Sequence, residues 1–331
     1  MNVQQVQKLP FDLHRIFSIQ TESEFEEMAI RAFQFQADGC EVYRSYIDLL
    51  GVNPKEVAKV SDIPFLPISF FKTHEVKSYN GAAELIFTSS GTTGQKRSQH
   101  HVADPALYQL SFLKGFERFY GHIEDYVVLA LLPSYMENDQ SSLIYMVDHL
   151  IELSRDKDSG FFLNDYERLI EIVQTRSDKK IILIGVSFAL MDLAEKYSPD
   201  LSSCIVMETG GMKGRRQEIT RSSLHENLKS AFHVENIHSE YGMTELLSQA
   251  YAVSDGIFQS PPWMKVFLRN TTDPFQFIDK GSGGINVIDL ANIYSCSFIE
   301  TEDLGRYNNT GFEVLGRFDN SDIRGCNLLI Q

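Results

Sequence analysis

The chain has 331 residues, 43% hydrophobic and 23% charged, which is typical of a soluble globular protein with one large or two modest domains. Its net charge of −15 excludes broad nucleic-acid binding, because phosphate polyanions are repelled at long range. No apolar run is long enough to cross a bilayer, no signal-peptide pattern opens the sequence, and the four cysteines form no CxxC pair. We therefore expect a cytoplasmic protein with free thiols, no integral membrane association and no zinc ribbon.

Residues 1–60 are expected to form a helical N-terminal segment packed on the core. Thr21 and Glu24 have the spacing of a capping box, and apolar residues recur at helical intervals through residues 24–51. Residues 64–71 follow as an extended stretch bounded by prolines.

Residues 61–245 alternate between strand-like and helix-like patterns. Asp104 and Pro105 predict the start of a helix, with proline at its first position. Continuous apolar strands interleaved with helices predict an α/β core around a largely buried sheet. The expected strands are 83–90, 126–133, 179–186 and 203–211, and the other expected helices are 141–153, 165–175, 188–197 and 222–232.

Residues 246–331 show a different sequence pattern, with short strand-like segments, turn residues and few helical patterns. They predict a smaller β-rich subregion followed by a C-terminal tail that carries Cys326. The expected strands are 265–269, 283–290, 296–301 and 312–317.

The segment from Ser89 to Lys96 concentrates glycine, serine and threonine after an expected strand. Its glycines permit positive φ and close approach, and its hydroxyls and backbone N–H groups are donors suited to a triphosphate. The spacing is not that of a Walker A loop. On glycine content alone, an ordinary polar βα turn is the alternative. The residues that would surround the phosphates are Ser89, Ser90, Gly91, Thr92, Thr93, Gly94 and Lys96.

Three further motifs are weak singly but informative in their order. They are YGMTE at 241–245, TEDLG at 301–305 and GR-x5-IRG at 316–325. Together with SSGTTGQK at 89–96, this order resembles the adenylate-forming superfamily of acyl-CoA ligases. The segments at 63–76, 131–151, 210–216 and 323–326 are more specifically similar to LuxE-type acyl-protein synthetases.

The resemblance implies the large domain of an adenylate-forming enzyme, with residues 61–245 as its nucleotide-binding core. It implies ATP-dependent activation of a carboxylic acid, a fatty acid in this subfamily, to acyl-AMP and pyrophosphate. The acyl group would then pass to a cysteine of the enzyme and on to an acyl reductase partner. ATP and Mg²⁺ are the implied cofactors, and such an enzyme is an acid–thiol ligase, a long-chain-fatty-acid–protein ligase.

The motifs assign roles by resemblance. Thr244 would contact the α-phosphate, and Glu245 would ligate Mg²⁺, which prefers oxygen ligands. Asp303 would accept hydrogen bonds from the ribose hydroxyls, and Arg317 would lie near the ribose. The expected adenine pocket and its surroundings comprise Gly210, Gly211, Met212, Tyr241 and Gly242.

Two departures from the superfamily pattern stand out. The usual TGD triplet is here Thr301-Glu302-Asp303, so the glycine is replaced while the aspartate is kept. Larger members continue into a mobile C-terminal domain with a catalytic lysine, whereas this sequence stops at Gln331. We therefore expect that domain to be absent and CoA-ligase behaviour to be weakened.

Cys326 is the candidate acyl acceptor. It lies nine positions after Arg317, and an extended chain of that length could reach roughly 30 Å. Arg324 is a nearby cation that would lower the pKa of the Cys326 thiol. From the residues alone a small buried apolar cysteine is the alternative. The remaining cysteines, Cys40, Cys204 and Cys296, lie in apolar segments and are expected in the core.

Other polar residues are weaker candidates. His100 and His101 are expected to be a surface pair, with phosphate or carboxylate contact as the alternative. His238 is a candidate for lining an acyl pocket and Ser134 for bordering it. Ser187 lacks the GxSxG pattern of a nucleophile elbow and is expected to cap a helix.

Three hypotheses of function follow. The first is an acyl-protein synthetase that acylates Cys326. The second is an adenylating ligase that passes the acyl group to CoA or a carrier thiol. The third is a non-catalytic nucleotide-binding subunit of a reductase complex, which would bind ATP without releasing pyrophosphate.

Overall fold

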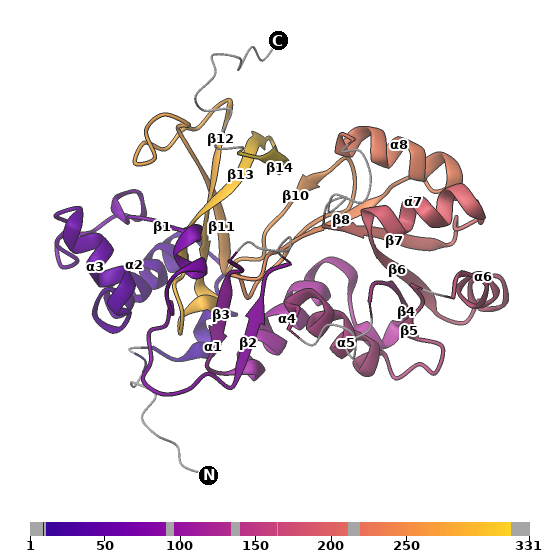
Figure 1. Cartoon of the computed structure of the whole chain (residues 1–331), viewed down its shortest axis with the longest axis horizontal. Helices are drawn as coiled ribbons and strands as arrows, with labels where there is room; N and C mark the ends of the chain where they lie inside the picture. The colour runs from indigo at the N-terminus through magenta and orange to yellow at the C-terminus, as the bar shows by residue number, and fades with distance from the viewer. Residues whose placement is uncertain are drawn as a thin grey trace. The chain divides into compact units, whose positions relative to one another are not determined.

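The computed structural model describes residues 9, 11–90, 96–133, 140–163, 165–210 and 219–318. The chain forms two compact units (Figure 1). The central unit is residues 83–261, and the terminal unit combines residues 1–82 with 262–331. These boundaries differ from the three contiguous regions described above, because strands near both ends of the chain belong to one sheet. Within the described residues, no helix has both the length and the apolar character needed to cross a membrane.

The central unit is built on a six-stranded sheet in the order β5-β4-β6-β7-β8-β9. All its strands are parallel except β9, which pairs antiparallel with β8. This mixed α/β sheet confirms the predicted fold class. The strands are β4 (Tyr126–Leu131), β5 (Gly160–Phe161), β6 (Lys180–Val186), β7 (Cys204–Thr209), β8 (His238–Tyr241) and β9 (Ala250–Ala252), and the short β10 (Ile257–Phe258) follows.

Helices cover both faces of this sheet, as the parallel arrangement requires (Figure 1). Every residue of β4 is buried, which is why its sequence is continuously apolar. The expected helix start is confirmed, since the Asp104 side chain accepts a hydrogen bond from the Ala106 N–H and Pro105 occupies the first turn. The helices are α4 (Pro105–Tyr120), α5 (Ser142–Ser154), α6 (Tyr166–Thr175), α7 (Ser187–Lys196) and α8 (Arg221–Phe232), with a 3-10 turn at Ile123–Asp125.

The candidate phosphate loop connects two strands, not a strand and a helix. Strand β2 (Leu85–Thr88) pairs antiparallel with β3 (Gln99–Val102), which the sequence patterns did not indicate. The loop is therefore the tip of a β-hairpin, and the alternative of a βα turn is wrong.

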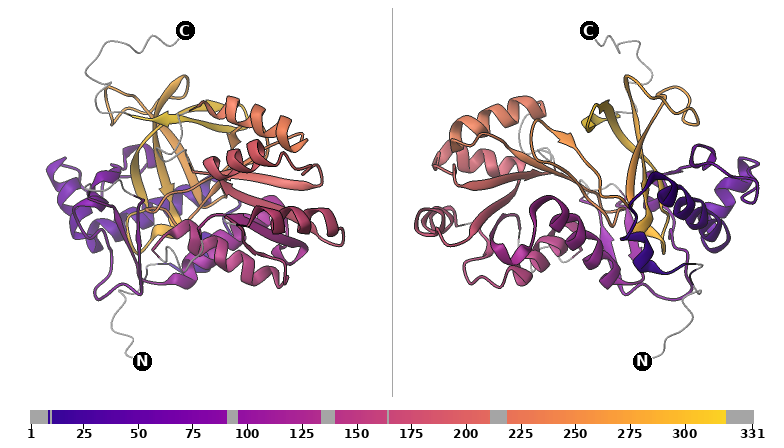
Figure 2. Two further views of the ribbon diagram at one scale, coloured as in Figure 1. Left: turned by 45° about the vertical axis from the view of Figure 1, so that its right-hand side comes forward. Right: turned by 180° about the vertical axis from the view of Figure 1, so that it is seen from behind.

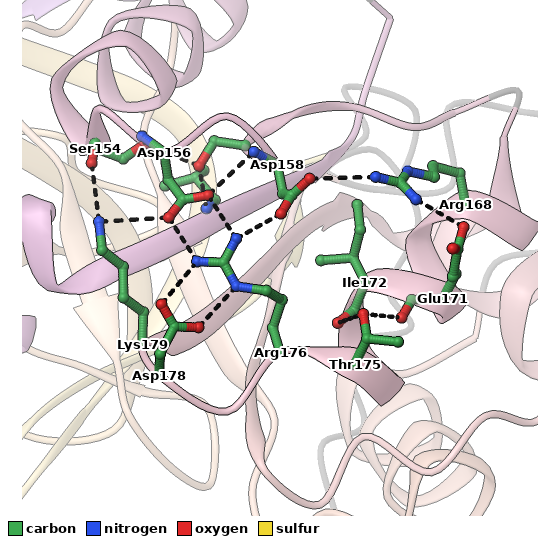
Figure 3. Close-up of polar contacts among 12 residues, drawn as sticks. Ser154, Asp156, Asp158, Arg168, Glu171, Ile172, Thr175, Arg176, Asp178 and Lys179 are labelled. Carbon is green, nitrogen blue, oxygen red and sulfur yellow. Dashed lines mark hydrogen bonds and ion pairs between the residues drawn. The ribbon is translucent and has the colours of Figure 1, made fainter.

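An ion-pair network fixes one edge of the central sheet (Figure 3). The Arg176 guanidinium, just after α6, pairs with Asp156, Asp158 and Asp178, and Lys179 also approaches Asp156 at 3.5 Å. Hydrogen bonds from Arg176 overcome partial burial and hold the pKa of Asp156 down, at about 2. The network ties the segment around β5 to the loop that leads into β6.

The terminal unit is built on an antiparallel sheet in which β11, β12, β13 and β14 follow one another, with β1 parallel to β13. The strands are β1 (Leu66–Pro67), β11 (Met264–Arg269), β12 (Ser282–Asp289), β13 (Phe298–Asn308) and β14 (Gly311–Arg317). The pairing of Leu66 on β1 with Ile299 on β13 joins segments more than two hundred residues apart in sequence.

The N-terminal helices pack beside this sheet, as both views in Figure 2 show. The capping box of Thr21 and Glu24 is confirmed. Phe298 of β13 packs against the rings of Phe33 and Tyr43, and the buried Gln36 amide donates to the Asn292 carbonyl at 2.9 Å. The helices are α1 (Leu13–Ile16), α2 (Glu22–Gly39) and α3 (Glu41–Leu49), and 3-10 turns lie at Val60–Asp62, Ile68–Lys72 and Leu290–Asn292.

Candidate functional site

Two hydrogen bonds join the ends of the candidate phosphate loop. The Ser89 N–H donates to the Ser98 carbonyl at 3.1 Å, and the Ser98 N–H donates to the Ser89 hydroxyl at 2.9 Å. These bonds close the hairpin directly below the loop, where Ser90 and Lys96 are exposed. Four of the predicted loop residues, Gly91, Thr92, Thr93 and Gly94, lie outside the described residues.

A buried histidine joins this hairpin to the Tyr241–Glu245 turn. His100 of β3 donates from Nδ1 to the Thr244 carbonyl at 2.8 Å, which assigns its tautomer. His100 and His101 are 1% and 8% exposed, so the predicted surface pair is wrong. Burial lowers the pKa of His100 to about 4, although the bond to Thr244 acts in the opposite direction. A neutral imidazole therefore holds two of the predicted motifs together.

Glu245, the candidate Mg²⁺ ligand, is 5% exposed. Among the described residues, no group of three or more His, Cys, Asp or Glu side chains is arranged around a common metal position. Magnesium at nucleotide sites takes one or two carboxylates, with phosphates and water as its other ligands. A single buried glutamate, next in sequence to Thr244, fits that arrangement and does not fit a metal cage made of protein ligands alone.

The turn after β7 begins at Gly210, whose φ of 67° favours glycine. The Ser187 hydroxyl donates to the Gly210 carbonyl at 2.7 Å. The prediction that Ser187 caps α7 is wrong, because the N-cap is Val186 and Ser187 is the first helical residue. Gly211 and Met212 lie outside the described residues.

One face of β7 and β8 carries a charged cluster. The buried Glu208 carboxylate accepts from Arg221 Nε at 2.9 Å, and His225 Nε2 lies 3.6 Å away. Burial acts to raise the pKa of Glu208, but hydrogen bonds from His225 and the charge of Arg221 outweigh it, so the pKa is lowered. This carboxylate is therefore held in its charged form next to the glycine turn.

The opposite face carries a second acid, Glu240, which is 7% exposed. Its carboxylate accepts a hydrogen bond from Thr209 of β7, and burial raises the pKa of Glu240 to about 7. Gly242 lies so close that a Cβ there would be 2.5 Å from Glu240 Oε1. Glu240 thus links the ends of β7 and β8, from which both candidate nucleotide-binding turns leave.

Tyrosines and amides surround this acid. Glu240 raises the pKa of three buried tyrosines, in each case adding to the larger effect of burial; they are Tyr108, Tyr120 and Tyr251. In the described part of the chain, the Tyr251 hydroxyl and the Gln249 Oε1 are buried without a hydrogen-bond partner. The Tyr120 hydroxyl contacts His238 Nδ1 at 3.2 Å, which places His238 at the edge of the same cluster. The region around Glu240 is therefore an unusually polar part of the core.

The terminal unit contains the two remaining predicted nucleotide residues. Asp303 on β13 and Arg317 on β14 are paired in register, and Arg317 Nε lies 3.4 Å from Asp303 Oδ1. Glu302, which replaces the expected glycine, lies 3.5 Å from Lys72. The structure therefore brings Asp303 and Arg317 together.

The described cysteines do not suit thiolate chemistry. Cys40 and Cys296 are buried, and burial raises the pKa of each thiol. Cys204 is only partly buried, unlike the core residue that was expected, and burial raises its pKa to about 11. Cys326 and Ser134 lie outside the described residues.

The polar groups that support these turns were not identified from the sequence. Glu208 fell within an expected strand and His225 within an expected helix, and neither Glu240 nor Arg221 was given a role of its own. One signal was present: each glutamate interrupts a buried strand whose other residues are mainly apolar or small. Their partners come from distant segments, which no local pattern indicates.

The sequence matches no family model and has no match among curated proteins. Solved structures do share its fold. ATP-bound MatB from Rhodopseudomonas palustris aligns with a TM-score of 0.53 at 18% identity, covering 72% of this chain and 49% of that chain. 2-Hydroxyisobutyryl-CoA ligase in an open conformation with 2-HIB-AMP and CoA aligns with a TM-score of 0.67 at 12% identity, covering 93% of this chain and 78% of that chain. The same ligase in the postadenylation state gives a TM-score of 0.66. The chain thus shares the mixed α/β fold of these ligases and spans about half the length of MatB.

Proposed function

We propose that this protein is an ATP-dependent enzyme that converts a carboxylic acid into its acyl adenylate. One observation carries the proposal: the His100–Thr244 hydrogen bond joins the serine- and threonine-rich hairpin to the Tyr241–Glu245 turn. Phosphate-binding donors and an acidic metal ligand thereby belong to one compact unit. The fold is shared with proteins solved with ATP and with an acyl-AMP, which supports the same chemistry here.

The chain's residues divide the work as follows. Ser89 to Lys96 surrounds the β- and γ-phosphates, Thr244 contacts the α-phosphate, and Glu245 holds Mg²⁺. Held there, Mg²⁺ would supply positive charge that offsets the negative charge on the phosphate oxygens. The glycine turn from Gly210 to Met212, with Tyr241 and Gly242, accommodates adenine. Asp303 accepts hydrogen bonds from the ribose hydroxyls, with Arg317 beside it.

In the reaction, a carboxylate oxygen of the acid bonds to the α-phosphorus and the bond to the β,γ-diphosphate breaks. The products are acyl-AMP and pyrophosphate. A thiolate then attacks the acyl carbon and AMP leaves, giving a thioester. We propose Cys326 as this thiol, a fatty acid as the substrate and an acyl reductase as the protein that receives the acyl group, on the strength of the LuxE-like segments.

Pyrophosphate release and intact-protein mass, measured with Mg·ATP and a panel of carboxylic acids, test both steps. Wild type should release pyrophosphate with its acid and gain the mass of one acyl group. Cys326→Ser should keep acid-dependent exchange of labelled pyrophosphate into ATP and lose the mass gain. Turnover with CoA or a carrier thiol, and no mass gain in wild type, would move the acceptor away from Cys326.

Glu245 provides the matched test of the adenylation step. Glu245→Gln removes the charge that we assign to Mg²⁺ binding and should lower pyrophosphate release by about a hundredfold or more. Glu235→Gln is the control, because Glu235 is an exposed glutamate on the loop before β8. ATP binding without pyrophosphate release in the wild type, whichever acid is added, would instead support a nucleotide-binding subunit.

A further inference from the structure

Arg269, at the end of β11, is a buried cation outside the motifs described above. Its side chain is 8% exposed. Its Nη1 donates to the Ile285 carbonyl and to Asn286 Oδ1, both at 2.9 Å, and its Nη2 donates to the Thr301 carbonyl at 2.7 Å. One guanidinium therefore joins β11, β12 and β13.

Two glycines of β12 make room for Arg269, one for its side chain and one for its backbone. A Cβ on Gly284 would lie 2.4 Å from the guanidinium carbon of Arg269, and a Cβ on Gly283 would lie 2.3 Å from its backbone oxygen. The register of β12 against β13 shifts between Gly284 and Asn286, so a bulge lies at the point that Arg269 fills. Strand β12 is thus shaped to accommodate Arg269.

The network continues to Asp303. The Thr301 hydroxyl donates to the same Ile285 carbonyl at 2.7 Å and accepts from the Asp303 N–H at 3.1 Å. The Thr301 peptide is consequently held at its carbonyl by Arg269 and at its side chain by Ile285. This arrangement fixes the backbone on which the Asp303 carboxylate is carried.

We infer that Arg269 is the positioning residue for Asp303, and that it determines how well the protein recognises the ribose hydroxyls of ATP. The inference rests on the proposed function, because the ribose role of Asp303 belongs to it. It also accounts for the missing glycine of the TED triplet. Conformation at Thr301-Glu302-Asp303 is set by the guanidinium network, so Glu302 is free to face Lys72 at the surface.

A simpler role would be electrostatic, since Arg269 Nε also lies 3.5 Å from Glu300. Neutralising the charge of Glu300 requires only a cation. Positioning Asp303 requires the several N–H donors of a guanidinium, which reach both β12 and β13. Arg269→Lys keeps the charge and loses the guanidinium, and therefore separates the two roles.

The test is equilibrium binding of Mg·ATP and of Mg·2′,3′-dideoxy-ATP to the full chain. Binding requires no knowledge of the acid substrate. Arg269→Lys should raise Kd for ATP about tenfold and leave Kd for the dideoxy nucleotide within about twofold. Asp303→Asn should show the same selective loss, and adding Arg269→Lys to it should cause little further change, because the two residues act as one unit.

Two further variants guard against misfolding. Gly284→Ala displaces the guanidinium without removing it and should reproduce the selective loss. Arg306→Lys is the matched control, because Arg306 lies on β13 and pairs with Glu313 at the surface. Each variant's Tm is recorded beside its Kd values.

The outcomes separate the inference from the function on which it rests. Equal weakening of both nucleotides in Arg269→Lys, or a lower Tm with no loss of ATP selectivity, overturns the positioning role while Asp303→Asn still supports ribose recognition. No selective loss in Asp303→Asn removes the ribose role of Asp303 and the inference with it.

Discussion

The Glu240 carboxyl is an expensive group to place in a protein core. Burial disfavours its charged form, and its pKa of about 7 lies well above the ordinary value of 4.5. An apolar residue in this strand would avoid that cost. Its retention beside the two candidate nucleotide-binding turns is typical of a functional site, where perturbed acids cluster.

Glu240→Gln tests this description through stability. The folded protein binds a proton at Glu240 that the unfolded chain releases between about pH 4.5 and pH 7. The resulting stabilisation is fully present below about pH 4.5 and is lost as pH rises through about 7. This contribution to the free energy of unfolding is about 3 kcal/mol. We expect urea unfolding to show that Glu240→Gln lacks this part of the pH dependence.

Glu235→Gln serves as the comparison, because the general increase in negative charge with pH affects both variants equally. The same pH slope in wild type and in Glu240→Gln would contradict a raised pKa at Glu240.

At the scale of elements, β6 and α7 approach closely at Gly185. A Cβ there would lie 2.8 Å from Leu190 Cγ and 3.1 Å from Leu131 Cβ. We expect Gly185→Ala to lower the free energy of unfolding by about 1–3 kcal/mol, because these buried atoms must move apart. Chemical denaturation measures the change.

Gly115→Ala in α4 is the matched control, since a Cβ added at Gly115 would lie 4.0 Å from its nearest neighbouring atom. It should stabilise α4 by about 0.5–1 kcal/mol through helix propensity. A neutral or stabilising Gly185→Ala would show that β6 and α7 tolerate a wider spacing than the structure has.

The Arg176 network makes a second prediction at this scale. Arg176→Met removes the common partner of three aspartates, so the carboxylates around β5 repel one another. We expect Tm at neutral pH to fall by several degrees. The difference from wild type should shrink as pH falls through about 2, where Asp156 becomes protonated. A difference that stays constant in acid would mean that Arg176 acts through packing alone.

Sequence patterns predicted the elements of the central sheet better than their pairing. Apolar runs identified β4, β6 and β7, and capping signals identified the starts of α2 and α4. Strand β3 was missed, because polar QHHV has no apolar alternation that marks a strand. The pairing of β1 with β13 was also missed, since such a distant contact depends on the fold as a whole.

The candidate site was predictable only in part. Motif order proposed Thr244, Glu245, Asp303 and the hairpin loop, because their chemistry lies in short segments, and their roles stay predictions. The buried supports, Arg269 above all, depend on neighbours in other strands. A lone arginine after MKVFL reads as the exposed end of a strand.

For the whole molecule, the net charge of −15 opposes both compactness and the approach of ATP. Raising NaCl from about 0.05 M to about 0.5 M should therefore raise Tm, because salt screens the self-repulsion. Differential scanning fluorimetry checks this directly. A lower Tm at high salt would mean that ion pairs such as those of Arg176 contribute more than the net charge.

The central claim is that the acid's own oxygen attacks the α-phosphate of ATP. The most direct test uses a carboxylic acid that the enzyme accepts as substrate, labelled with a heavy oxygen isotope at both carboxylate oxygens. The masses of the nucleotide and phosphate products are then measured. Adenylation predicts one heavy oxygen in AMP and none in pyrophosphate. Heavy oxygen in inorganic phosphate, with ADP as the nucleotide product, would mean attack at the γ-phosphate and would contradict the account.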